Sequence, residues 1–116
     1  MSVDRSVIAT HRPKVTADGL WREGFRVIGR PNKRMTLHIQ NPTADTISVR
    51  AREANDQSTW VSIYGMTMDV VAGGTGTLDV YWTDENLIID VQGSEDGQVL
   101  LEEVGHTNAF SEGLSK

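Results

Sequence analysis

Three histidines, His11, His38 and His106, are the side chains of this sequence best suited to proton transfer near neutral pH. Covalent catalysis also needs a nucleophile within hydrogen-bond reach of its base, and a third group that orients the base. His38 alternates with apolar residues in "RMTLHIQ" and should point to solvent, while the other two histidines lie near the weakly patterned ends. The chain has no cysteine, which excludes thiol chemistry. We therefore expect no catalytic residues and a protein that is not an enzyme.

Carboxylates gather in the second half of the chain, where several fall between expected strands. Loop carboxylates can bind calcium, but the dense acidic alternation of a calcium-binding loop is missing, and "GSEDG" supplies only Glu95 and Asp96. A solvated acidic face that keeps strand edges from aggregating explains the same residues. The glycines of "AGGTG" precede an expected strand rather than a helix, so they do not form a phosphate-binding loop. We expect neither a metal site nor a cofactor.

Aromatic side chains offer a second kind of site, because exposed rings can stack against sugars. The candidates are Trp21, Trp60, Tyr64, Tyr81 and Trp82. Trp82 shares a strand face with Leu78 and Val80, which indicates a position in the core. Trp60 follows the polar run "NDQS" and shares its face with Tyr64. For Trp60 two interpretations stay open, packing in the core and an exposed contact with a partner.

Basic side chains concentrate at the start of the chain. Residues 1–34 hold eight of the eleven lysines and arginines and three acids, whereas residues 35–116 hold thirteen of the sixteen acids. The acidic part repels nucleic acid, and the basic part lacks the interleaved aromatics of single-strand binders. Either the two regions are solvated faces that offset one another, or the basic segment contacts an acidic surface on a neighbouring subunit. The residues that we expect to contact a partner are Arg5, Arg12, Lys14, Arg22, Arg26, Trp60 and Tyr64.

Alternating apolar residues predict the strands that position these side chains. "RMTLHIQ" and "TISVRARE" both repeat with period two and are separated by the turn formers of "NPTAD", which favours a β-hairpin. "NDQS" is the next expected turn, with a strand returning from Trp60, and the glycines at 72–76 predict another hairpin turn. Turn signals recur about every 8–12 residues and no helical repeat occurs. We therefore expect an all-β protein, an antiparallel β-sandwich, Ig-like or jelly-roll-like, of about eight strands.

The 116 residues suffice for one domain, and the 38% of apolar residues is typical of a globular chain. We divide the chain into an N-terminal arm with one or two edge strands (1–33), a β-sandwich body (34–104) and a C-terminal tail (105–116). No apolar run approaches the ~20 residues of a membrane-spanning helix. The first residues also lack the apolar core of a secretory signal. We expect no association with a membrane.

Five segments between Met35 and Val104 resemble a type of small β-sandwich found among virion proteins of tailed bacteriophages. They are "LHIQNPTADTISV", "NDQSTW", "VVAGGTGTLDVYW", "LIIDVQG" and "GQVLLEE". The turn that is usually "D-G-S-T-W" in this type has Gln57 in place of its glycine.

This resemblance implies a structural protein of the virion, most simply a capsid decoration or cement protein. Such a protein would bind major capsid or other virion proteins, bridge neighbouring subunits, and be made in the host cytoplasm before it joins the particle. It would form a homo-oligomer, with a trimer as one form, and its arm would pair with a neighbour's edge strand. The alternative is a carbohydrate-binding or adhesin-like β-sandwich module that uses Trp60 and Tyr64.

Overall fold

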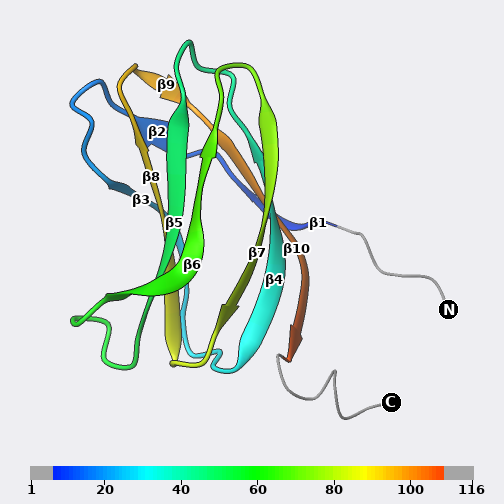
Figure 1. Ribbon diagram of the computed structural model, residues 1–116. Coiled ribbons are helices and arrows are strands. Elements are labelled where there is room, and N and C mark those ends of the chain that lie inside the picture. The colour runs from blue at the N-terminus through cyan, green and yellow to red at the C-terminus, as the bar shows by residue number, and fades with distance from the viewer. Residues whose placement is uncertain (1–6, 109–116) are drawn as a thin grey trace, which may run out of the picture.

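Two four-stranded antiparallel sheets stack face to face in the computed structural model, which describes residues 7–108 (Figure 1). The first sheet consists, in spatial order, of β1 (Val7–His11), β10 (Leu100–Asn108), β4 (Lys33–Gln40) and β7 (Thr75–Trp82). The second sheet consists of β3 (Arg22–Val27), β8 (Asn86–Gly93), β5 (Ile47–Ala54) and β6 (Val61–Val70). At one end of the sandwich a short ladder joins β2 (Lys14–Val15) and β9 (Gly97–Gln98).

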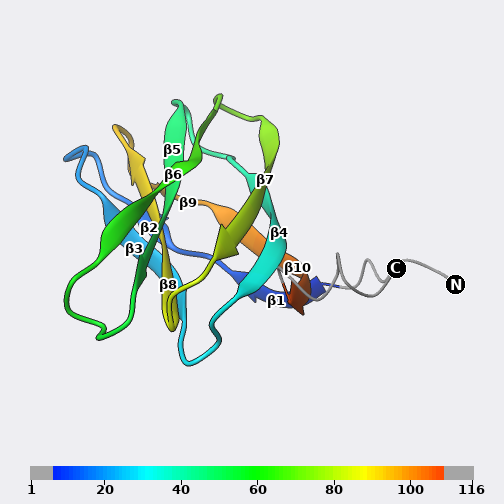
Figure 2. The same ribbon diagram turned by 60° about the horizontal axis from the view of Figure 1, so that its bottom comes forward.

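The order of the strands is that of a jelly roll. Apart from the β5–β6 pair, each successive long strand from β3 to β10 lies in the opposite sheet to the one before it. Figure 2 shows the two sheets as separate layers on either side of the core. The expected antiparallel β-sandwich is confirmed. Between residues 7 and 108, no helix is long and apolar enough to cross a membrane.

One hydrophobic core fills the space between the sheets. In β4 the alternation places Met35, Leu37 and Ile39 inside, and none of them is more than 2% exposed. Burying a side chain of this size stabilises the fold by roughly 1.5–3 kcal/mol. Trp82 of β7 is 1% exposed and donates from Nε1 to the carbonyl oxygen of Arg30 at 2.7 Å, so its polar atom is satisfied. The predicted core position of Trp82 is confirmed.

Two connections differ from the sequence prediction. The predicted hairpin between residues 34–40 and 46–53 is wrong, because β4 and β5 lie in different sheets. The glycine-rich turn at 72–76 likewise leads from β6 in the second sheet to β7 in the first. Alternation tells which side chains of a strand point inward, but not which sheet the strand joins. The turn at "NDQS" does join the antiparallel neighbours β5 and β6, as predicted.

Asn41 fixes the two connections that cross between the sheets. It is 1% exposed, and its Nδ2 donates to the carbonyl oxygens of Asp45, Val70 and Val71 at 2.8, 2.9 and 3.1 Å. Its Oδ1 accepts hydrogen bonds from the backbone N–H and the hydroxyl of Thr43 at 3.0 and 2.6 Å. Two backbone hydrogen bonds also join Asn41 to the glycine-rich turn before β7. One buried amide therefore ties together the ends of both sheets.

From residue 7 onward, the segment that we expected as an arm is built into the sandwich. β1 and β3 are edge strands of the two sheets, and β1 pairs with β10. His11 of β1 stacks on Phe25 of β3 with ring centroids 4.0 Å apart, and its Nε2 lies 2.5 Å from Oε2 of the buried Glu103. The stacking of His11 on Phe25 joins the two sheets along one side. At the other end of the chain, β10 continues to Asn108, into the range expected as a tail.

Candidate functional site

The outer face of the second sheet contains buried side chains where a solvent-facing sheet usually has exposed ones. In β8, Leu87, Ile89 and Val91 enter the core, so Ile88 and Asp90 point outward. Nevertheless Ile88 is 2% exposed and Asp90 is 1% exposed. Other side chains must therefore cover this face.

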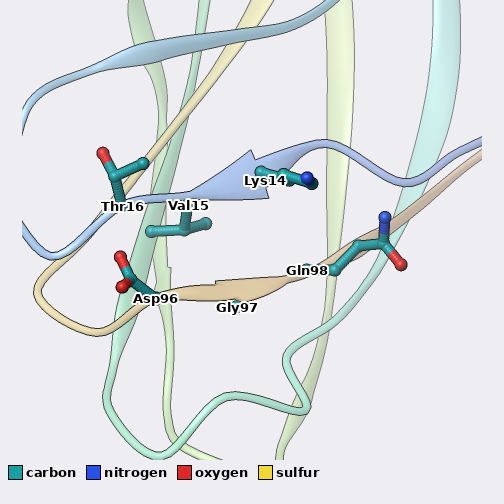
Figure 3. A pocket seen from close by; sticks show the side chains of 6 residues that line it. All are labelled: Lys14, Val15, Thr16, Asp96, Gly97 and Gln98. Atoms are coloured by element: carbon teal, nitrogen blue, oxygen red, sulfur yellow. The ribbon is translucent and has the colours of Figure 1, made fainter.

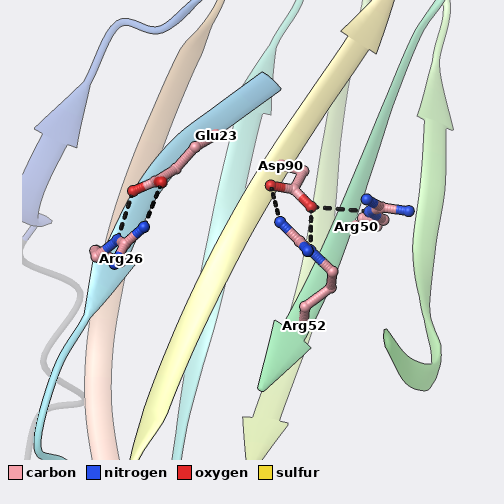
Figure 4. Close-up of polar contacts among 5 residues, drawn as sticks. All are labelled: Glu23, Arg26, Arg50, Arg52 and Asp90. Atoms are coloured by element: carbon pink, nitrogen blue, oxygen red, sulfur yellow. Dashed lines mark hydrogen bonds and ion pairs between the residues drawn. The ribbon is translucent and has the colours of Figure 1, made fainter. Parts of the chain in front are cut away.

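Two arginines of β5 cover Asp90 (Figure 4). Arg50 donates from Nε to Oδ2 of Asp90 at 2.8 Å. Arg52 donates from Nε to the same oxygen at 2.6 Å and from Nη2 to Oδ1 at 3.1 Å. The register explains the contact, because Arg50 is the direct partner of Asp90 on the neighbouring strand and Arg52 follows on the same face. A buried carboxylate is stable only with such partners, so the three charged groups hold one another in place.

Trp21 lies against Arg50 from the β3 edge of the sheet. The centre of its ring is 4.2 Å from the guanidinium carbon, within the range of a cation–π contact. The turn that precedes Trp21 is anchored by Gln92 of β8, whose Nε2 donates to the carbonyl oxygen of Gly19 at 2.8 Å. Gly19 has a φ of +70°, which glycine adopts without strain. The position of this indole is thus set by the sheet beneath it.

The loop between β5 and β6 positions a second indole, that of Trp60. Oδ1 of Asp56 accepts hydrogen bonds from the backbone N–H groups of Thr59 and Ser58, both at 2.9 Å. These bonds lower the pKa of Asp56 to about 2. Trp60 then donates from Nε1 to the carbonyl oxygen of Gln57 at 3.1 Å, which closes the loop on itself. The segment "NDQSTW" is a turn, and it also orients an aromatic ring.

Trp60 is half-buried outside the hydrophobic core, and it lies against Arg26 with 5.4 Å between ring centre and guanidinium carbon. Arg26 belongs to β3 and Trp60 precedes β6, the strands at opposite edges of the sheet. The two side chains therefore meet above the inner strands, where Ile88 is the direct partner of Arg26. Arg26 is held by two hydrogen bonds of 2.7 Å to Glu23 (Figure 4), and these bonds lower the pKa of that carboxyl group. The core-packing interpretation of Trp60 is wrong.

These side chains form two contact groups on the same outer face, which adjoin where Glu23 pairs with Asp90 between β3 and β8, and we call the two groups together the Arg–Trp layer. Its members are Trp21, Glu23, Arg26, Arg50, Arg52, Trp60 and Asp90. Every guanidinium group in it is held by a carboxylate, and two of them also lie against an indole. Such a surface can recognise acidic, aromatic or polar groups with little loss of side-chain entropy.

A bulge in β6 presents Tyr64 beside the Arg–Trp layer. The pairing of β5 with β6 is interrupted between Arg50 and Arg52, and Gly65 has a φ of +78° within the interruption. As a result Tyr64 is 99% exposed. This ring makes no contribution to the core and is available to a partner.

The predicted contact residues fall into two groups. Arg26 and Trp60 lie within the Arg–Trp layer, and Tyr64 stands beside it. Arg22 starts β3 and forms an exposed ion pair with Asp18 at the margin of the same sheet. The structure therefore brings three of the six described candidates, Arg26, Trp60 and Tyr64, to one outer face.

The remaining candidates lie elsewhere. Lys14 lines an open hollow at the end of the sandwich, and the lining consists of Lys14, Val15, Thr16, Asp96, Gly97 and Gln98 (Figure 3). Gln98 donates from Nε2 to the carbonyl oxygen of Arg12 at 3.0 Å, and Asp96 accepts a hydrogen bond from the backbone of Ala17 at 2.8 Å. These polar groups connect loops to one another. Arg5 falls in residues 1–6, which with residues 109–116 lie outside the described residues.

Sequence reasoning did not select Trp21, Arg50, Arg52 or Asp90 as contact residues. A signal was present in "TISVRARE", where both arginines alternate with the inward-facing Val49 and point to one face. Asp90 similarly interrupts an apolar run on the outward side of its strand. What the sequence does not show is that β5 and β8 are neighbours, so the acid could not be matched with its two bases.

His11 and His38 both lie on strands of the first sheet. His11 is paired with Glu103 and stacked on Phe25, and His38 is exposed on β4, as predicted. Among residues 7–108, no group of three or more histidine, cysteine, aspartate or glutamate side chains could hold a metal ion.

Fold and site together define a jelly-roll sandwich with a preorganised Arg–Trp layer on one outer face. No protein-family model and no curated protein matches the chain. Among solved structures, the chain is similar to "Crystal structure of PirA", with a TM-score of 0.68, 13% identity, and coverage of 88% of this chain and 99% of that one. It also matches CBM22-1–GH10 modules of a Clostridium thermocellum xylanase 10B complexed with xylohexaose, with a TM-score of 0.46 and 14% identity. That match covers 90% of this chain and 25% of the other. At these identities the likeness concerns the fold alone.

Proposed function

We propose that this protein is a non-enzymatic structural component that adheres to a neighbouring protein through the Arg–Trp layer and Tyr64. The observation that carries the proposal is the gathering of arginine, tryptophan and tyrosine on one outer face. These are the residue types that dominate the binding energy of protein interfaces. Because ion pairs already hold the arginines, docking would cost little side-chain entropy.

The setting that we propose is the virion of a tailed bacteriophage, where the chain acts as a capsid decoration or cement protein. The resemblance of the segments between Met35 and Val104 to phage β-sandwich proteins supports this setting. A cement protein bridges neighbouring subunits, so several moderate contacts add to a high avidity. In this proposal the protein forms a homo-oligomer, binds major capsid or other virion proteins, and does not bind nucleic acid.

The proposal is tested with phage capsids that were assembled without this chain. Purified protein is added, and the bound fraction is measured by co-sedimentation over a range of concentrations. We expect saturable binding that weakens about tenfold or more in Tyr64→Ala, because a large exposed aromatic side chain that becomes buried on binding is a typical hot spot. The matched control is Tyr81→Ala, since Tyr81 is also exposed (49%) but points outward from the first sheet. Absence of binding, or equal weakening by both variants, would contradict the proposal.

A second candidate function is a carbohydrate-binding module, and the observation that favours it is the nearly complete exposure of Tyr64. Glycan arrays test it directly. Binding to a defined glycan that is lost in both Trp60→Ala and Tyr64→Ala, with no binding to capsids, would establish this function in place of the first.

A further inference from the structure

Arg50 differs from the other arginines of the Arg–Trp layer in how many of its donors are used. Arg26 and Arg52 each donate through Nε and Nη2 to both oxygens of one carboxylate. Among the hydrogen bonds of the described residues, Arg50 donates only through Nε, to Asp90. An arginine has five N–H donors in a fixed planar fork. The terminal amino groups of Arg50 thus remain for a ligand.

The orientation of this guanidinium is fixed from two sides. The 2.8 Å bond to Asp90 holds Nε at the sheet, and the ring of Trp21 lies 4.2 Å from the guanidinium carbon. Asp90 is itself 1% exposed, so the anchor is rigid. Figure 4 shows the end of the Arg50 side chain pointing away from Asp90, toward the side of the sheet where β6 lies. Its side chain is 24% exposed, so a partner can reach it.

The charge at this point favours an anion. Arg50 and Arg52 share one carboxylate, that of Asp90, so the three groups together carry one unbalanced positive charge. A carboxylate matches the planar fork of a guanidinium with two parallel hydrogen bonds, and the neighbouring indole limits access of water.

We propose that Arg50 is the receptor for a carboxylate of the partner protein, the side chain of a glutamate or aspartate that docks beside Trp21. This inference rests on the proposed function and names the chemistry of the partner at one point of the interface. Both indoles already have a guanidinium against them, which suits a protein surface of mixed residues better than a flat stack of sugar rings.

The probe is a capped peptide of six glutamates, titrated into the full-length protein. The signals are the Arg50 Nε–H and the Trp21 indole N–H in nitrogen–proton correlation spectra. We expect saturable shifts of both signals with the glutamate peptide and none with a capped peptide of six glutamines. In Arg50→Lys, which keeps the charge but loses the fork, the affinity should fall about tenfold. The matched control Arg22→Lys should keep it, because Arg22 is at the margin of the sheet and is paired with Asp18.

Further experiments distinguish a carboxylate of a protein from that of an acidic sugar, and provide a second variant in case the first fails to fold. If trigalacturonate binds at Arg50 more tightly than the glutamate peptide, the inference that the carboxylate belongs to a protein partner is refuted. If the affinity for the glutamate peptide is unchanged in Arg50→Lys, or if the glutamine peptide gives equal shifts, the inference that Arg50 binds a carboxylate is refuted. If Arg50→Lys does not fold, Trp21→Leu replaces it, and this variant should also bind the glutamate peptide more weakly. Capsid binding that survives in Arg50→Lys would refute only this inference, whereas peptide binding without capsid binding would refute only the proposed function.

Discussion

At the scale of single residues, Asp56 has the clearest dependence on pH. The backbone N–H groups of Thr59 and Ser58 hold the pKa of Asp56 at about 2, below the ordinary value of 3.8. A carboxyl group with a depressed pKa stabilises the folded state above its unfolded pKa, and this contribution is lost as the pH falls through the folded value. We predict that Asp56→Ala lowers the free energy of unfolding at pH 5, and that the difference from the unmodified protein shrinks between pH 4 and pH 2.

Urea unfolding at a series of pH values measures this difference. The exposed Glu95 in the turn before β9 provides a control with the same change of charge, and Glu95→Ala should follow the unmodified protein at every pH. A difference for Asp56→Ala that stays constant down to pH 2 would show that the two N–H bonds do not form in solution.

Local chemistry of this kind can be predicted from the sequence, whereas the Arg–Trp layer cannot. "NDQS" indicates a turn because the side chain of Asp56 bonds to backbone only two and three residues away. Asp90 instead meets Arg50 and Arg52 across about forty residues of chain. The outward position of each side chain follows from alternation, but their meeting depends on which strands become neighbours.

At the scale of secondary-structure elements, Asn41 joins the two connections that cross between the sheets. In Asn41→Asp, an oxygen would face the carbonyl groups of Asp45, Val70 and Val71, which now accept from Nδ2. We predict that this variant lowers the free energy of unfolding by roughly 3 kcal/mol, because buried acceptors lose their donor and meet a repelling atom. Chemical denaturation measures the loss.

The control for this variant is Asn55→Asp. Oδ1 of Asn55 accepts a hydrogen bond from the backbone of Glu85 at 3.0 Å, a role that a carboxylate can also fill. We expect its stability to stay within about 0.5 kcal/mol of the unmodified protein, as for most surface changes. Equal losses in both variants would mean that the donors of Asn41 have no special role.

The strands themselves were largely predictable, and their connections were not. Met35, Leu37 and Ile39 alternate without interruption and lie in the core as expected. Yet the turns at 41–46 and 71–74 consist of the same residue types that close a hairpin. Only the contacts of a buried amide with both turns show that the chain changes sheets there, and no local pattern reports such contacts.

At the scale of the whole molecule, β1 closes one edge of the first sheet. Removing residues 1–12 would uncover the edge of β10 and delete the contact of His11 with Glu103 and Phe25. We predict a loss of about 2 kcal/mol, equivalent to a melting temperature roughly 10 °C lower, together with self-association through the exposed edge. Thermal unfolding and light scattering measure the two effects. A shorter deletion of residues 1–5, which leaves every described strand intact, is the control, and an identical melting temperature for both would contradict the prediction.

The pairing of β1 with β10 has a consequence for biosynthesis. Of the strands that the structure describes, β1 is synthesised first, and it finds its place only beside β10, the last of them. Folds that depend on contacts between distant parts of the sequence form slowly, commonly in milliseconds to seconds. Until β10 has been synthesised, the emerging polypeptide therefore holds unpaired strands and open apolar surface, so chaperones that shield nascent chains should affect its yield more than its final stability.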